Sequence, residues 1–247
     1  MVNIISKNYL FENIQLVIFD KDGTITDINK YWSYVISQRA NYFGEKYKNL
    51  DLKNEIRISL GLTSEKVISK ESPIGKKSRD EIVSLIFQVV NNYHNCSMSE
   101  ILEGFSYVDS LVEKNINLIT SLLPGVKKFI KTLKENNCII TLATQDTSKN
   151  AIYNLDYLRI GHCFDKVIGS ELVKKAKPDP EMGYKILEGY PTISPENILV
   201  IGDSLVDLHF ANNLNTNFLG VNTGVQGSFD SEKSISLVKN LQFIEVI

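Results

Sequence analysis

In the stretch IQLVIFDKDGTITD, residues 14–27, an apolar run comes directly before two aspartates, Asp20 and Asp22. A short apolar, β-branched run that stops at a polar residue is typical of a buried strand in a parallel sheet. We therefore predict a strand over residues 14–19. This strand ends at Asp20, and Asp22 follows two positions later. The two carboxylates thus stand where a buried strand passes into its loop, which is where α/β proteins bind ligands.

The composition is that of an ordinary globular protein. The sequence has 247 residues, 43% of them hydrophobic and 23% charged, with a net charge of −2. This length allows a full core and a second small domain, and the weak charge gives no field for nucleic acid. No apolar run reaches the ~18 to 20 residues of a membrane span, and the N-terminus lacks a secretory signal. We expect a cytoplasmic protein without nucleic-acid or membrane partners; its oligomeric state stays unknown.

The cysteines indicate no covalent or metal framework. Cys96, Cys138 and Cys163 are odd in number and widely spaced. Their spacing fits neither a disulfide scaffold nor a zinc site. We interpret them as small buried side chains.

A helical block interrupts the chain after the first strand. In SRDEIVSLIFQVVNNYH, residues 78–94, the side chains of Ile82, Ile86, Val89 and Tyr93 lie on one predicted helical stripe. No convincing strand pattern interrupts residues 28–117. We predict an all-α domain over residues 28–117, inserted into an α/β core formed by residues 1–27 and 118–247.

Strands and helices alternate after the insertion. LLPGVKKFIKTLKENN, residues 122–137, carries an apolar helical stripe that begins just after Pro124. Further helices are predicted near 148–158, 180–189 and 205–213. The predicted strands are CIITLAT (138–144), DKVIGS (165–170), NILVIGD (197–203) and NFLGV (217–221). This alternation predicts a Rossmann-like parallel sheet with helices on both faces.

Polar side chains follow the predicted strands. Besides Asp20 and Asp22, they are Thr144 after the second strand, Lys177 in KKAKPDP, Asp203 in GDSLVD, and Asp207 one helical turn later. Because the carboxyl ends of parallel strands share one edge of the sheet, we expect these side chains to form one site.

The residue types at this edge favour phosphoryl chemistry. Clustered carboxylates repel unless a cation or a proton stabilises them, and oxygen-only ligands favour Mg²⁺ over zinc. Mg²⁺ with a lysine suits a phosphoryl group, whose oxygens need positive partners. Asp20 could then attack as a nucleophile, and Asp22 could act as general acid and base. Gly23 permits a sharp exit from the strand, and Thr24 could hold the loop.

The motifs DKDGTI, the strand that ends in Thr144, KPDP and GDSLVD resemble, in this order, those of the haloacid dehalogenase-like superfamily. The helical block between the first two motifs is similar to a C1-type cap, as in phosphoglycolate phosphatases and phosphomutases. The resemblance implies that Asp20 is the nucleophile and Asp22 the general acid/base. It implies that Thr144 hydrogen-bonds the transferring phosphoryl group and that Lys177 neutralises charge between the nucleophile and the phosphate. It further implies that Mg²⁺ is held by Asp20, by the backbone carbonyl of Asp22 and by Asp203. Asp207 and Thr24 would support the site.

Three functions stay open at this point. The first is a phosphatase for a small phosphorylated metabolite, whether phosphoglycolate, a sugar phosphate or a nucleotide. The second is a phosphomutase, which would use the same two aspartates. The third is a regulatory protein that accepts a phosphoryl group, although the long insertion and the acid at Asp22 argue against it. A final glycine pair, in GVQG at residues 224–227, is interpreted as a turn after the last predicted strand.

Overall fold

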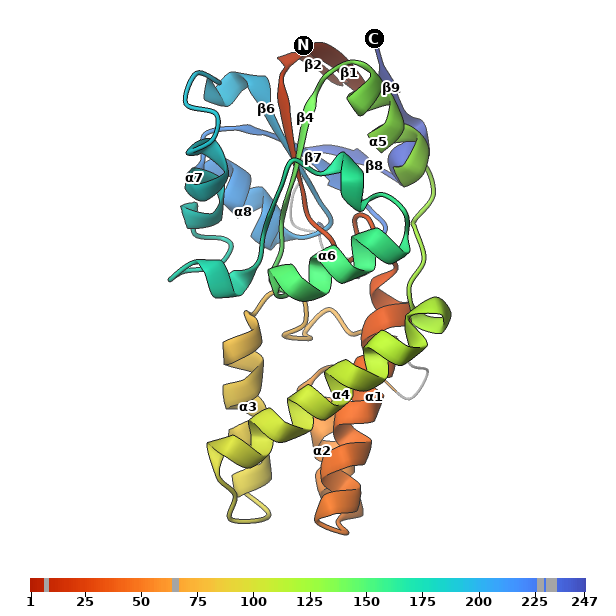
Figure 1. Cartoon of the computed structure of the whole chain (residues 1–247), viewed down its shortest axis with the longest axis vertical. Coiled ribbons are helices and arrows are strands. Elements are labelled where there is room, and N and C mark those ends of the chain that lie inside the picture. Colours follow the sequence, from red (N-terminus) through yellow and green to blue (C-terminus); the bar gives the residue numbers. More distant parts are fainter. Residues whose placement is uncertain (7–8, 64–66, 226–228, 230–234) are drawn as a thin grey trace. The chain divides into compact units, whose positions relative to one another are not determined.

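The computed structural model describes residues 1–6, 9–63, 67–225, 229 and 235–247. Contacts within the chain divide it into two compact units. The first consists of Met1–Asp27 and Ser121–Ile247, and the second of Ile28–Thr120. The first unit carries the sheet and the second is built from helices (Figure 1).

The first unit is organised around a six-stranded sheet whose neighbouring strands all run parallel. Its order is β5-β4-β3-β6-β7-β8, the doubly wound arrangement in which the first strand of the sheet, β3, lies at the centre. This confirms the predicted fold class. The strands are β3 (Leu16–Phe19), β4 (Ile139–Ala143), β5 (Lys166–Ile168), β6 (Ile198–Gly202), β7 (Asn217–Val221) and β8 (Ser236–Val238).

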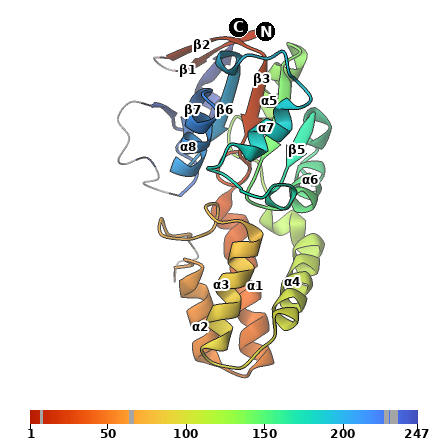
Figure 2. The ribbon, with the colours of Figure 1, turned by 90° about the vertical axis from the view of Figure 1, so that its left-hand side faces the viewer.

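Helices cover both faces of this sheet (Figures 1 and 2). One core contains Val17 and Phe19 of β3 together with apolar residues of α5 (Val126–Glu135) and α6 (Ser148–Tyr157). The opposite core contains Leu16 and Ile18 with residues of α7 (Glu181–Leu187) and α8 (Leu205–Asn213). Because successive side chains of a strand point to opposite faces, β3 is buried on both sides, as its apolar run predicts.

A small antiparallel sheet was not predicted. It has the order β2-β1-β9, from β1 (Val2–Ser6), β2 (Tyr9–Ile14) and β9 (Ile244–Val246). The predicted strand over residues 14–19 was therefore wrong at its start, since β2 ends at Ile14 and β3 begins at Leu16. Short 3₁₀ turns cover Gly161–Cys163, Ser170–Leu172, Pro195–Asn197 and Leu241–Phe243.

The second unit contains α1 (Ile28–Lys46), α2 (Leu50–Ser59), α3 (Arg79–Asn91) and α4 (Met98–Ile119). Capping boxes start α3 and α4, where Ser78 and Ser97 each bond reciprocally with a glutamate three residues later. Ile82, Ile86 and Val89 are buried as predicted, but Tyr93 is exposed because α3 has already ended. None of the helices in the described ranges has the length and apolar character of a membrane span.

Candidate functional site

The predicted site residues meet where the strand order of the sheet reverses. β3 pairs with β4 on one side and with β6 on the other, and Phe19 is level with both Leu142 and Ile201. Asp20 and Asp203 therefore leave two adjacent strands almost side by side, and the Asp20 amide donates to the Ile201 carbonyl at 2.9 Å. A switch point of this kind is where doubly wound sheets bind ligands, outside the carboxyl ends of their strands.

Lys177 joins two of the aspartates. Its Nζ lies 2.6 Å from Oδ1 of Asp20 and 2.6 Å from Oδ1 of Asp207. Lys177 is only 3% exposed, so its ammonium is stabilised by these two carboxylates and not by water. The second oxygen of Asp207 accepts a 2.6 Å hydrogen bond from the Ser204 hydroxyl. Asp207 therefore supports Lys177 directly.

Burial and neighbouring charges shift the pKa values of Asp20, Asp203 and Lys177. Burial raises the pKa of Asp20 to about 7, although the Lys177 ammonium acts in the opposite direction. Burial also raises the pKa of Asp203 well above its usual range, and the charges of Asp20 and Asp207 add to that effect. Burial lowers the pKa of Lys177, but the two carboxylates that it contacts more than offset this, so the net shift is upward. The raised pKa values of Asp20 and Asp203 therefore indicate that too little positive charge lies near these two carboxylates.

A cation would supply that charge. Carboxylate oxygens of Asp20, Asp203 and Asp207 lie within 4.8 Å of one another, and all three residues are buried. An oxygen-only set of this kind fits a hard divalent ion. The side-chain cluster contains Asp207 and not Asp22, whose predicted contribution to the metal is its backbone carbonyl.

Two glycines make room for the Asp203 carboxylate. Gly23 has a φ of +91°, which disfavours any other residue, and a Cβ there would lie 2.5 Å from Oδ2 of Asp203. A Cβ on Gly224 would overlap the same carboxylate. The Thr223 hydroxyl donates to the Gly23 carbonyl at 2.6 Å and ties these two loops together. The first glycine of the GVQG segment, Gly224, therefore also leaves space for the Asp203 carboxylate, in addition to following the last predicted strand. Residues 226 and 227 of this segment lie outside the described part of the chain.

The loop after β3 is held by its own backbone. The amides of Ile25 and Thr26 both donate to the Lys21 carbonyl, at 2.9 and 3.0 Å. Oδ1 of Asp22 accepts from the Thr26 hydroxyl at 3.2 Å and from Nζ of Lys21 at 2.9 Å. The Thr24 hydroxyl lies 3.5 Å from Oδ1 of Asp203, so Thr24 makes at most a weak hydrogen bond across the site.

Thr144 lies one residue beyond β4 and is buried. Its Oγ1 accepts a 3.1 Å hydrogen bond from the Asp146 amide. Within the described ranges the hydroxyl donates to no other group, so its proton can be donated to a ligand. The next residue, Gln145, donates from Nε2 to the Lys177 carbonyl at 2.7 Å. The segment after β4 therefore also fixes the backbone that carries Lys177.

Sequence reasoning missed five residues at this edge. They are Lys21, Gln145, Asp146, Thr223 and Gly224. Only Lys21 gave a local signal, because a lysine directly between two motif aspartates follows a strand buried on both faces. The other four act through contacts with residues distant in the sequence.

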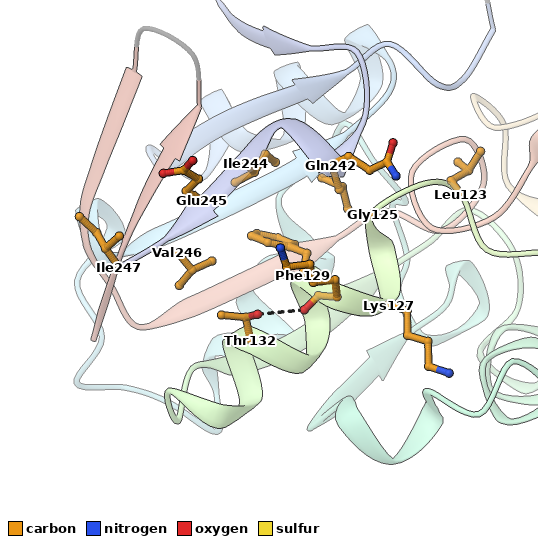
Figure 3. Close-up of a pocket in the computed structure, with 12 residues that line it drawn as sticks. Leu123, Gly125, Lys127, Phe129, Thr132, Gln242, Ile244, Glu245, Val246 and Ile247 are labelled. Carbon is orange, nitrogen blue, oxygen red and sulfur yellow. Dashed lines mark hydrogen bonds between the residues drawn. The ribbon is translucent and has the colours of Figure 1, made fainter.

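A separate groove of about 760 Å³ lies between α5 and β9 (Figure 3). Phe129, Thr132, Gln242 and Val246 are among the residues that line it. It contains none of the predicted site residues, so it is distinct from the acidic site.

Fold and site together define an α/β protein with a buried acidic centre, paired with a lysine, at the switch point of its parallel sheet. The chain belongs to the haloacid dehalogenase-like hydrolase family, whose model matches residues 17–221. This match confirms the superfamily that the motifs resemble.

Two curated relatives cover most of the chain. Phosphoglycolate phosphatase 1 of Pseudomonas aeruginosa is 25% identical over 194 residues, which are 78% of this chain and 64% of that protein. The phosphorylated carbohydrates phosphatase of Thermotoga maritima is 25% identical over 194 residues, 77% of each chain.

Solved structures share the fold. The crystal structure of a predicted phosphoglycolate phosphatase from Haemophilus somnus has a TM-score of 0.68 at 19% identity, covering 91% of this chain and 94% of that one. The β-phosphoglucomutase of Clostridium difficile has a TM-score of 0.64 at 25% identity, covering 92% of each chain.

Proposed function

We propose that the protein is a Mg²⁺-dependent phosphatase that hydrolyses a small organic phosphate monoester through an aspartyl-phosphate. The observation that carries the proposal is the buried pairing of Asp20 with Lys177 beside Asp203 and Asp207, at the switch point of the sheet. The two phosphatase relatives agree with this reaction class.

In the proposed first step, a carboxylate oxygen of Asp20 attacks phosphorus while the bond to the leaving oxygen breaks. Asp22 gives its proton to that oxygen, so an alcohol departs and Asp20 carries the phosphoryl group. In the second step, Asp22 takes a proton from water, whose oxygen attacks phosphorus while the bond between phosphorus and the Asp20 oxygen breaks. Inorganic phosphate leaves, and both aspartates return to their starting states.

Other residues bind the phosphoryl oxygens. The Thr144 hydroxyl has a proton to donate, and the Lys177 ammonium lies next to the attacking carboxylate. Asp20 and Asp203, with the Asp22 carbonyl, would hold Mg²⁺, and Asp207 would support the set. The ion would neutralise charge on the phosphoryl oxygens as they move.

The test uses release of inorganic phosphate from p-nitrophenyl phosphate and from a panel of phosphorylated metabolites. We expect turnover with Mg²⁺, complete loss on chelation with recovery on adding Mg²⁺ back, and no turnover for Asp20→Asn. The Asp165→Asn variant, at a half-exposed position on the same unit, should keep its activity. Undiminished turnover by Asp20→Asn would overturn the covalent route.

A phosphomutase is the second candidate, and the likeness to the β-phosphoglucomutase structure favours keeping it. Such an enzyme would return the phosphoryl group from Asp20 to a second hydroxyl instead of to water. Product analysis separates the two functions, because a phosphatase releases one phosphate for each substrate consumed while a mutase yields an isomer.

We further propose that the helical unit is the cap of this enzyme and selects the substrate. Substitutions confined to this unit should then change the order of preference within the metabolite panel and leave the dependence on Asp20 intact.

A further inference from the structure

A lysine without an assigned role lies between the two motif aspartates. Lys21 is fully buried, with no exposed surface. Its Nζ lies 2.9 Å from Oδ1 of Asp22 and 3.3 Å from Oδ2 of Asp146. Burying an ammonium is costly unless carboxylates compensate it, so these contacts explain how the residue is accommodated. They also connect the loop after β3 to the loop after β4.

Asp146 is itself fixed. Its Oδ1 accepts from the Thr147 amide at 2.8 Å and from the Asn150 amide group at 3.3 Å, at the start of α6. Its own backbone amide donates to Thr144. Asp146 is 5% exposed, and its Oδ2 is the oxygen that faces Lys21. Residues at the start of α6 therefore fix the Asp146 carboxylate, which in turn pairs with Lys21.

The hydrogen bonds to the Asp22 side chain involve only one of its two oxygens, Oδ1, among the described residues. Lys21 and Thr26 both donate to Oδ1. Among the residues that the structure describes, none donates a hydrogen bond to Oδ2. Two donors therefore hold Oδ1, and Oδ2 is the oxygen of Asp22 that is left to exchange a proton in the proposed reaction.

We propose that Lys21, held by Asp146, is a positioning residue that orients Asp22 so that Oδ2 delivers the proton to the leaving group and later receives one from water. The inference rests on the proposed function, in which Asp22 is the general acid and base. Lys21 exchanges no proton in either step. It fixes which oxygen of Asp22 faces the reacting atoms.

The leaving group gives a readout that a purely structural role would not move. p-Nitrophenolate departs without a proton, whereas an alkoxide needs one. We therefore compare kcat/KM, which reports the first chemical step, for p-nitrophenyl phosphate and for an alkyl phosphate that the wild type hydrolyses. A misplaced acid slows the alkyl substrate selectively.

For Lys21→Met we expect kcat/KM to fall roughly 100-fold with the alkyl phosphate, the lower range of general acid catalysis, and by less than about tenfold with p-nitrophenyl phosphate. Asp146→Asn should show the same selectivity to a smaller extent. The double variant should resemble Lys21→Met alone, because the two residues act in series. Lys134→Met is the matched control, since Lys134 pairs with Asp165 at 3.0 Å on the surface of the same unit.

An equal fall for both substrates, or no fall, in a folded Lys21→Met variant would overturn the inference while the wild type still releases phosphate. A wild type that releases no phosphate from either class would instead overturn the proposed function. If Lys21→Met does not fold by circular dichroism, Asp146→Asn decides the matter, because asparagine retains the size and an oxygen that can accept from the Thr147 amide. A crystal structure of that variant should show the Asp22 carboxylate turned away from its wild-type orientation.

Discussion

Replacing Gly224 by alanine would test the geometry of the acidic site with a single methyl group. A Cβ at this position would lie 2.7 Å from Cβ of Asp203, with the Asp203 carboxylate closer still. Carbon atoms pack best at ~3.5 to 4.0 Å, so the two residues must separate by roughly 1 Å. A displacement of this size in a catalytic group costs about 100-fold in rate, or about 2.7 kcal/mol. We expect kcat/KM to fall by that factor.

The assay combines phosphate release with thermal unfolding at increasing Mg²⁺ concentration. In the wild type, saturation to about 100 times Kd should add about 2.7 kcal/mol to the free energy of unfolding. This gain should shrink in Gly224→Ala, because Asp203 no longer lies in place. Gly189→Ala is the control, since its Cβ would meet only the Ile186 carbonyl oxygen, at 3.7 Å. Wild-type activity together with a wild-type response to Mg²⁺ in Gly224→Ala would refute the reasoning.

Two further predictions concern other buried groups. Lys177→Met should lower the free energy of unfolding by about 3 kcal/mol in urea titrations, because Asp20 and Asp207 lose their shared ammonium; a loss below about 1 kcal/mol would contradict this. Burial raises the pKa of the Cys138 thiol from 9.0 to about 12, so a thiol reagent at pH 8 should label Cys163 and spare Cys138 until urea unfolds the protein. The folded state then binds more protons between these two values, so the stability from the neutral thiol is complete below pH 9 and should decline toward pH 12. The total loss of stability over this range should be smaller in Cys138→Ala than in the wild type, because the contribution of this thiol is removed.

The central sheet could be predicted because each of its inner strands is a short apolar run buried on both faces. The prediction for residues 217–221 agrees with β7, and that for 205–213 agrees with α8. The antiparallel sheet could not be predicted in the same way. β1 and β9 pair across nearly the whole length of the chain, and their stability depends on that pairing more than on a local pattern.

Those site residues that directly follow a strand could be predicted from the sequence. Asp20 and Asp203 follow adjacent strands, so the topology alone brings them together. What Lys21 and Gly224 do could not be inferred, because a lysine is usually solvated and a glycine usually marks a turn. Lys21 contacts Asp146 as well as the adjacent Asp22, and Gly224 lies against Asp203. The two distant partners, Asp146 and Asp203, are brought to these positions only by the fold.

The two points where the chain leaves and re-enters the sheet unit are joined to each other. The Asp27 amide donates to the Ser121 carbonyl at 3.3 Å, and Thr26 bridges Leu122 in antiparallel fashion. The inserted helical segment, residues 28–120, therefore begins and ends at two positions of the sheet unit that are bonded to each other. Its length and sequence can change while its two ends stay joined at this junction. One sheet unit can therefore be combined with many different insertions while Asp20, only six residues before the junction, keeps its place.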